Sequence, residues 1–330
     1  MRSRLRSSLW TSTGRLRVPW RLLLAAVLFV STNLLISGLS VAAGVPPGLS
    51  PGADGEGLVI ALLLFVVNGA ATAAAIVLAA RYLDARTIAD LGVRLDETGR
   101  SDFFVGAGLG VALTDGPFLA GAAAGVYEFR VAPSGPPNRS LAVWLLLLVA
   151  AMGAVGVSEE LLVRGYALTN LAEGFTAVLG RRGATVAAVA VTGLGFGALH
   201  TGNPNATALS FLTIALAGVM LGLGYVLTGS IALPVGLHVS WNLTHALLNL
   251  PVSGLDVGVY LVESEPVGPE YIHGGQFGPE GGLLGTAAAL AGCSAIVGYA
   301  RLTDRTLDEN VAVPRFYGGA APTDGDAGEQ

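Results

Sequence analysis

The sequence predicts an all-α membrane protein, a polytopic bundle of about eight transmembrane helices, and three observations lead to this prediction. Of the 330 residues, 52% are hydrophobic and only 12% are charged, and the mean hydropathy is +0.65. No Asp, Glu, Lys or Arg occurs from Gly183 to Leu255. Apolar segments of membrane-spanning length recur along the chain. A soluble domain could not hide so much apolar surface.

The same composition excludes several other classes of protein. The hydrophobicity rules out a disordered chain, and the single cysteine, Cys293, rules out a disulfide scaffold. A net charge of −5 argues against a nucleic-acid partner, because a phosphate-binding surface needs a basic face.

Each predicted span is an apolar segment of roughly 20 residues, the length that a helix needs to cross a hydrocarbon core about 30 Å thick. The first span follows arginines as a signal peptide does, but its apolar stretch is longer than a typical signal sequence, so we expect it to be retained. The eight segments run from Leu22 to Gly44, Leu58 to Ala80, Phe103 to Tyr127, Leu141 to Leu162, Ala184 to His200, Thr207 to Leu227, Ile231 to Leu250 and Leu283 to Ala300.

The distribution of arginines predicts the orientation of these spans. With a cytoplasmic N-terminus, all but two of the 18 basic residues fall on the cytoplasmic side, the exceptions being Arg130 and Arg139. The arginine-free loop that then lies outside contains five acidic residues, Asp256, Glu263, Glu265, Glu270 and Glu280. We therefore expect a multi-pass protein of the cell membrane with both termini in the cytoplasm.

No internal repeat divides the chain, and short Gly/Pro-rich segments read as loops between helices. The expected parts are a cytoplasmic Arg-rich N-terminal segment (1–21), N-terminal transmembrane helices (22–140), a catalytic core (141–250), an acidic external loop with the last helix (251–300) and a polar cytoplasmic tail (301–330).

Ionisable residues inside a membrane are costly, so each one in an apolar span is a functional candidate. The fourth span ends in Glu159 and Glu160, followed by Arg164. Glu160 and Arg164 are four residues apart and can form an ion pair, which leaves Glu159 without a local partner and suited to act as a general base. Alternatively, both glutamates are charges at the headgroup level and Arg164 is a cytoplasmic anchor.

Two further clusters lie in the fifth and seventh spans. Phe196 and His200 share one helical face, and His238 and Asn242 share another. Two hydrogen-bond donors four residues apart are suited to holding a developing oxyanion. Alternatively, such residues join neighbouring helices by hydrogen bonds, which is common in membrane bundles.

Taken together, the three clusters resemble the CPBP family of intramembrane proteases, which includes the type II CAAX prenyl endopeptidases and bacterial immunity-type relatives. The family pattern EExxxR, FxxxH and HxxxN is intact in Glu159 to Arg164, Phe196 to His200 and His238 to Asn242. The resemblance covers about residues 141–250.

The resemblance implies an endopeptidase that cleaves near the cytoplasmic membrane face. Glu159 would be the general base, His200 would position the attacking water, and His238 and Asn242 would stabilise the oxyanion. Glu160, Arg164 and Phe196 would support them. Members are usually described as metalloproteases, and Glu159, His200 and His238 together match the ligand set of a catalytic Zn²⁺. A metal-free mechanism based on glutamate is the alternative, because the chain lacks an HExxH helix.

One geometric difficulty accompanies this interpretation. If the fifth span begins near Ala184, His200 lies roughly 24 Å from the cytoplasmic surface, much deeper than His238. The site can close only if that helix begins earlier, tilts, or breaks near Gly193 and Gly195.

The expected partners are a peptide or membrane-anchored protein substrate and the lipid bilayer. Two other functions fit the same residues. A transporter or ion pathway could use them to relay protons, although internal symmetry typical of transporters is not apparent. A non-catalytic scaffold or immunity-type protein could use the fold to bind a partner.

Overall fold

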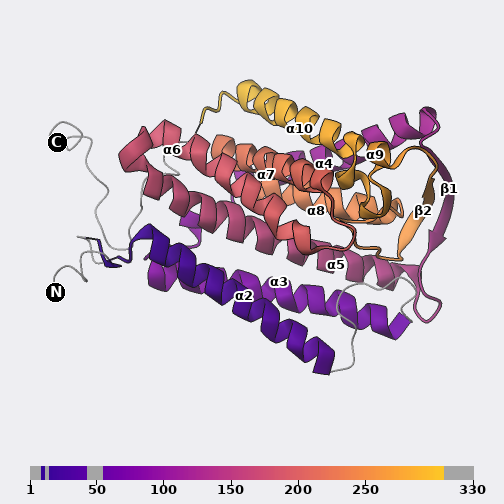
Figure 1. Cartoon of the computed structure of the whole chain (residues 1–330), viewed down its shortest axis with the longest axis horizontal. Coiled ribbons are helices and arrows are strands. Elements are labelled where there is room, and N and C mark those ends of the chain that lie inside the picture. Colours follow the sequence, from indigo (N-terminus) through magenta and orange to yellow (C-terminus); the bar gives the residue numbers. More distant parts are fainter. Residues whose placement is uncertain (1–8, 12–14, 43–54, 308–330) are drawn as a thin grey trace.

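The computed structural model describes residues 9–11, 15–42 and 55–307, and it confirms an all-α bundle (Figure 1). Parts of the expected N-terminal segment and most of the expected tail lie outside these residues. Within the described part, six helical runs are long and apolar enough to cross a membrane. They are α2 (Val18–Ala42), α3 (Gly55–Leu83), α4 (Glu97–Ala123), the run Leu141–Gly202, α7 (Ala208–Thr228) and α10 (Leu283–Leu302).

The run Leu141–Gly202 contains two passages and corrects one predicted boundary. Helix α5 (Leu141–Glu160) does not end near Leu162; it continues through the π-helical segment η2 (Leu161–Leu168) into α6 (Thr169–Leu199). The turn comes at Gly180, whose φ of 66° and ψ of 172° are not helical. Counting both passages, and adding α8 (Ala232–Leu247), gives the expected number of about eight.

This longer path resolves the difficulty with the depth of His200. Glu159 lies 21 residues before Gly180 and His200 lies 20 residues after it, so each is roughly 30 Å along a helix from the turn. The two residues therefore reach the same level of the bundle. Gly193 and Gly195 lie inside α6 and do not break it.

Small residues bring α4 and α8 into close contact. A Cβ atom added at Gly106 of α4 would lie 2.1 Å from the Leu233 carbonyl oxygen, and one added at Gly236 of α8 would lie 2.1 Å from the Phe103 carbonyl oxygen. Neither position can carry a side chain without separating the helices, as in other membrane bundles packed through glycine. The contact places α8 in the middle of the bundle, where α5 and α7 also pack against it.

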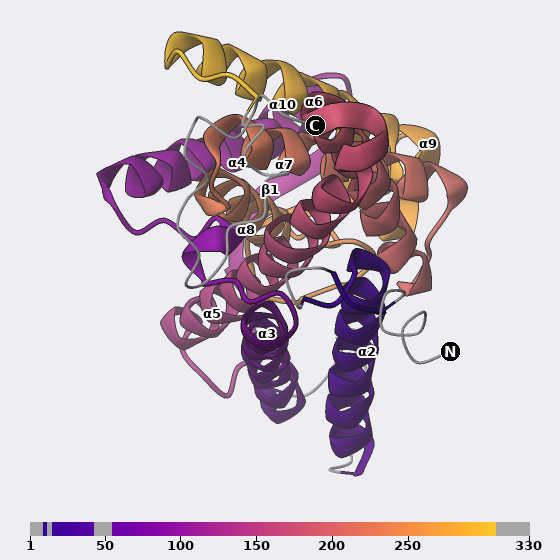
Figure 2. The same cartoon turned by 90° about the vertical axis from the view of Figure 1, so that its left-hand side faces the viewer.

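The remaining helices surround this centre. Helices α2 and α3 lie together on one side of the bundle and α10 lies on the opposite side (Figures 1 and 2). At one end, β1 (Tyr127–Ser134) and β2 (Tyr260–Pro266) pair antiparallel, with Tyr127 opposite Pro266. The sequence analysis did not predict these strands. The short helix α9 (Glu270–His273) lies at the same end, which we call the strand end.

The opposite end of the bundle contains most of the arginines and is called the arginine end. It includes the turn at Gly180, the start of α8 and the end of α10 (Figure 1). Arg164, however, does not lie there as a surface anchor: its side chain is completely buried in the interior. The alternative that treated Arg164 as a cytoplasmic anchor is therefore wrong.

Candidate active site

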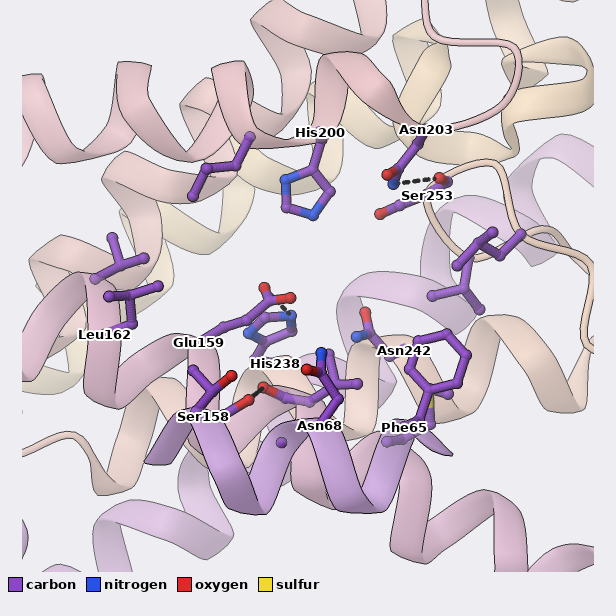
Figure 3. A pocket seen from close by; sticks show the side chains of 18 of the residues that line it. Phe65, Asn68, Ser158, Glu159, Leu162, His200, Asn203, His238, Asn242 and Ser253 are labelled. Carbon is purple, nitrogen blue, oxygen red and sulfur yellow. Dashed lines mark hydrogen bonds and ion pairs between the residues drawn. The ribbon is translucent and has the colours of Figure 1, made fainter. Parts of the chain in front are cut away.

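A cavity of about 460 Å³ lies among α2, α3, α5, α6 and α8, and all four predicted catalytic side chains line it. Figure 3 shows Glu159, His238 and Asn242 around this cavity, with His200 facing them from another helix. The residues come from three different helices and are up to 83 positions apart in the sequence. The fold thus brings together the three clusters that the sequence analysis singled out.

The two neighbouring glutamates have different environments. Glu160 is fully buried, and its Oε1 accepts a hydrogen bond of 2.7 Å from Arg164 Nη1. Arg164 also donates to the Gly218 carbonyl oxygen, and its guanidinium carbon lies 4.6 Å from the centre of the Phe196 ring. The Glu159 side chain is 33% exposed and faces the cavity. Glu160 is therefore held in place by Arg164, whereas Glu159 is available for chemistry.

His238 is oriented by Glu160. Its Nδ1 lies 2.8 Å from Glu160 Oε1, and an ionised carboxylate can only accept, so Nδ1 carries the proton and donates. The other ring nitrogen, Nε2, lies 3.9 Å from Glu159 Oε2. This distance is too long for a direct hydrogen bond but suits two groups that share a water molecule.

His200 is oriented by the backbone of its own helix. Its Nδ1 lies 2.8 Å from the Phe196 carbonyl oxygen, which can only accept, so this nitrogen also carries a proton. Nε2 of the neutral ring is then an acceptor. The Phe196 ring packs edge-on against both imidazoles, with centroid distances of 4.7 Å to His200 and 5.8 Å to His238. Phe196 therefore separates and positions the two histidines.

Asn242 lies one helical turn beyond His238 and lines the same cavity. It is buried, with 6% of its surface exposed. The packing of α8 against α4 and α5 fixes the direction of both side chains. Asn242 and His238 thus present an amide and an imidazole to one space, as expected for two residues four apart on a helix.

The sequence left open whether Glu159, His200 and His238 hold a metal ion. Within the described residues, no group of three or more His, Cys, Asp or Glu side chains is arranged to hold a metal ion. The possible Zn²⁺ site of Glu159, His200 and His238 is therefore not shown, and the description of the protein as a metalloprotease is not supported.

Several other polar residues of the cavity were not among the residues predicted from the sequence. Asn33 of α2 and Asn68 of α3 line it and are joined by a 3.1 Å hydrogen bond from Asn68 Nδ2 to Asn33 Oδ1. Asn68 Oδ1 is buried and has no hydrogen-bond partner among the described residues. Both are amides in apolar spans, and the rule that singled out His238 and Asn242 could have found them.

The strand end of the cavity is lined by a loop that a second buried carboxylate, Glu280, holds in place. Asn203 Nδ2 donates to the Ser253 carbonyl oxygen at 2.9 Å, and both residues line the cavity. Glu280 accepts hydrogen bonds from the Ser253 amide and hydroxyl, each at 2.7 Å, and from Trp241 Nε1 at 2.9 Å. Glu280, expected only as part of an acidic external loop, therefore anchors this loop to α8.

Comparison with known proteins agrees with this geometry. Residues 140–244 match the family model described as type II CAAX prenyl endopeptidase Rce1-like. No curated protein and no solved structure matches the chain. The matched segment covers less than half of the chain, and it contains Glu159, His200, His238 and Asn242. Residues 140–244 of this membrane protein are therefore an Rce1-like domain of the type II CAAX prenyl endopeptidase family.

Proposed function

We propose that the protein is an integral membrane endopeptidase in which Glu159 activates a water molecule for attack on a peptide bond. The observation that carries this proposal is the arrangement of Glu159 and His238 across the cavity. Their facing atoms are 3.9 Å apart, and His200 and Asn242 line the same space. A water molecule between them would contact a carboxylate that can accept its proton.

The reaction follows from these positions. Glu159 takes a proton from the water as its oxygen bonds to the carbonyl carbon of the scissile peptide. The carbonyl oxygen becomes an oxyanion, which accepts hydrogen bonds from the Asn242 amide and from His238. When the C–N bond breaks, Glu159 returns the proton to the leaving nitrogen. The products are a carboxylic acid and an amine, and the enzyme regains its starting state.

The hydrogen bond made by Nδ1 of each histidine determines whether its Nε2 can donate or accept a hydrogen bond. Because His238 Nδ1 donates to Glu160, its Nε2 can donate to the oxyanion only when the ring is an imidazolium. The negative charge of Glu160 faces that ring and compensates the positive charge of the imidazolium. The same carboxylate also forms an ion pair with Arg164. His200 Nε2 accepts a hydrogen bond from the attacking water and orients it. In this scheme Glu160 and Arg164 are positioning residues.

Substitution of Glu159 tests the mechanism. The wild type and Glu159→Gln are purified in detergent and incubated with a pool of lipidated and unmodified peptides in ¹⁸O-water, and the products are identified by mass spectrometry. We expect the wild type to release peptides with ¹⁸O in the new carboxyl group. We expect Glu159→Gln to be slower by roughly 10²–10⁴-fold, the usual contribution of a general base.

The exposed Glu128 on β1 provides a matched control, because Glu128→Gln removes a carboxylate that does not line the cavity. That variant should cleave at the wild-type rate. Wild-type cleavage by Glu159→Gln would overturn the proposed mechanism.

The structure does not favour the transporter alternative. A pathway for protons or ions has to connect both sides of the membrane. Along η2, which leads from the cavity towards the arginine end, Arg164, Tyr166 and Leu168 are all at most 1% exposed. These buried side chains separate the cavity from that end of the bundle.

A further inference from the structure

The catalytic cavity reaches the strand end of the bundle and not the arginine end. Its lining includes Asn203, Val252, Ser253, Leu255 and Val257, which lie in the loops after α6 and α8 at the strand end. At the arginine end, neither the segments 84–96, 229–231 and 303–307 nor the turn of α6 at residues 180–183 contributes a lining residue. The cavity therefore extends towards the strand end.

The depth of the catalytic residues agrees with this direction. His200 directly follows the last residue of α6. Asn242 lies ten residues, or roughly 15 Å, after the start of α8 at the arginine end and only five residues, or roughly 8 Å, before its other end. His238 lies one turn deeper. The proposed chemistry is thus placed in the half of the bundle that is nearer to the strand end.

A buried ion cluster closes the arginine end. Glu173 of α6 accepts hydrogen bonds from Arg21 at 2.6 Å, from Arg86 at 2.8 Å and from Arg15 at 3.2 Å. Asp84 lies within 3.8 Å of Arg21 and of Arg86. These contacts join the start of α2, the segment after α3 and the middle of the run that contains α6. The cluster therefore holds these three segments together at the arginine end.

The charges of the two ends identify the faces of the membrane. At the strand end the only arginines of the described chain are Arg130 and Arg139. The other exposed or clustered arginines, at positions 15, 17, 21, 81, 86, 94, 100, 181, 182, 301 and 305, all belong to the arginine end. Arginine-rich loops stay in the cytoplasm. The strand end is consequently the external end.

We infer that the cavity opens to the external face of the membrane, so that the substrates are membrane-anchored or exported peptides whose scissile bond lies in the outer leaflet. This inference rests on the proposed peptidase function. It replaces the expectation of cleavage near the cytoplasmic face. The first and last described parts of the chain, around Arg17 and Arg305, lie at the arginine end, whereas the cavity extends towards the strand end.

Labelling of single cysteines tests the direction of the cavity without requiring activity. Cys293, the only cysteine, is first replaced by alanine. Single cysteines are then introduced at the exposed Thr201 and Asp256 of the strand end, at the cavity-lining Leu255, and at the exposed Arg182 and Asp304 of the arginine end. Intact and permeabilised cells are treated with a membrane-impermeant maleimide.

We expect Thr201→Cys, Asp256→Cys and Leu255→Cys to be labelled equally in intact and permeabilised cells. Arg182→Cys and Asp304→Cys should be labelled only after permeabilisation. The reverse pattern would overturn the inference. Labelling of Leu255→Cys only after permeabilisation, with Asp256→Cys labelled in intact cells, would also overturn it, because the cavity would then be closed to the external side.

A pair of reporters tests the substrate class. Each is a single-span protein with the same cleavable segment, chosen from the peptide pool, placed either just outside or just inside the membrane. We expect cleavage of the external reporter only, and loss of that cleavage in Glu159→Gln. Glu159-dependent cleavage of the cytoplasmic reporter alone would overturn the inferred external opening of the cavity. It would still agree with the proposed peptidase function. External labelling without cleavage of either reporter would contradict the proposed function and leave the direction of the cavity standing.

Discussion

Two buried clusters of charged residues lie in opposite halves of this bundle, and their carboxylates have different surroundings. Glu173, at the arginine end, accepts hydrogen bonds from three arginines and does not line the cavity that contains Glu159. Glu159, nearer to the strand end, faces the cavity, and its Oε2 has no hydrogen-bond partner among the described residues. A carboxylate saturated by cations holds helices together, whereas one facing open space can accept a proton. The comparison distinguishes a glutamate in a structural ion cluster from the glutamate that we propose as the general base.

The largest effect on stability is expected for Glu173→Gln. The substitution leaves three arginines with Asp84 as their remaining acidic partner in the cluster, and breaking a buried ion pair typically costs about 3–5 kcal/mol. We expect the free energy of unfolding in bicelles to fall by that amount. The turnover of the molecules that remain folded should be unchanged. If the folded molecules lose their peptidase activity, Glu173 is not merely structural and the comparison fails.

A slightly smaller effect, this time on catalysis, is expected for Asn242→Ala. Removing one oxyanion donor usually lowers kcat by roughly 10²–10³-fold. KM should change little, because the proposed hydrogen bond forms in the transition state. Steady-state kinetics on a peptide from the pool provide the measurement. An increase in KM at constant kcat would show instead that Asn242 binds the substrate in its ground state.

The three polar clusters could be predicted from the sequence because ionisable residues are rare in apolar spans. Glu159, His200, His238 and Asn242 stand out for that reason, and all four line one cavity. The boundary at Gly180 could not be predicted in the same way. Arg164 interrupts an apolar segment, and such an interruption normally marks the end of a span. Only the tertiary contacts with Glu160 and Gly218 show that it is buried.

Long-range contacts account for the other features that the sequence analysis missed. The pairing of β1 with β2 joins segments more than 120 residues apart, and the two strands carry no distinctive pattern. Arg15, Arg21 and Arg86 could be assigned to the cytoplasmic side, but not to a shared carboxylate at Glu173. Asn33 and Asn68 could have been predicted as site residues from the sequence, because each is the only asparagine in an apolar helix.

A moderate effect is expected for Asn68→Leu. The free Asn68 Oδ1 would accept a hydrogen bond from a backbone N–H of the bound peptide. Such a bond contributes roughly 1 kcal/mol, so we expect KM to rise by about five- to tenfold while kcat is nearly constant. Thr32→Val on α2, whose side chain does not line the cavity, is the control and should leave both constants unchanged. A fall in kcat alone would contradict a role in substrate binding.

No effect is expected from chelation. The proposed base is the Glu159 carboxylate, and the described side chains form no group that could hold a metal ion. Metal content and peptidase activity should be measured on the same purified sample, before and after treatment with 1,10-phenanthroline. Loss of activity that Zn²⁺ restores would require a metal-based mechanism and would change the role of Glu159 from base to ligand.

The most direct test of the central claim measures turnover and thermal unfolding on one sample of Glu159→Gln. Because Glu159 faces the cavity and makes no ion pair as short as that of Glu160, its loss should leave the unfolding temperature within a few degrees of the wild type. Peptide cleavage should disappear. Cleavage at the wild-type rate by a normally folded Glu159→Gln protein would contradict the account.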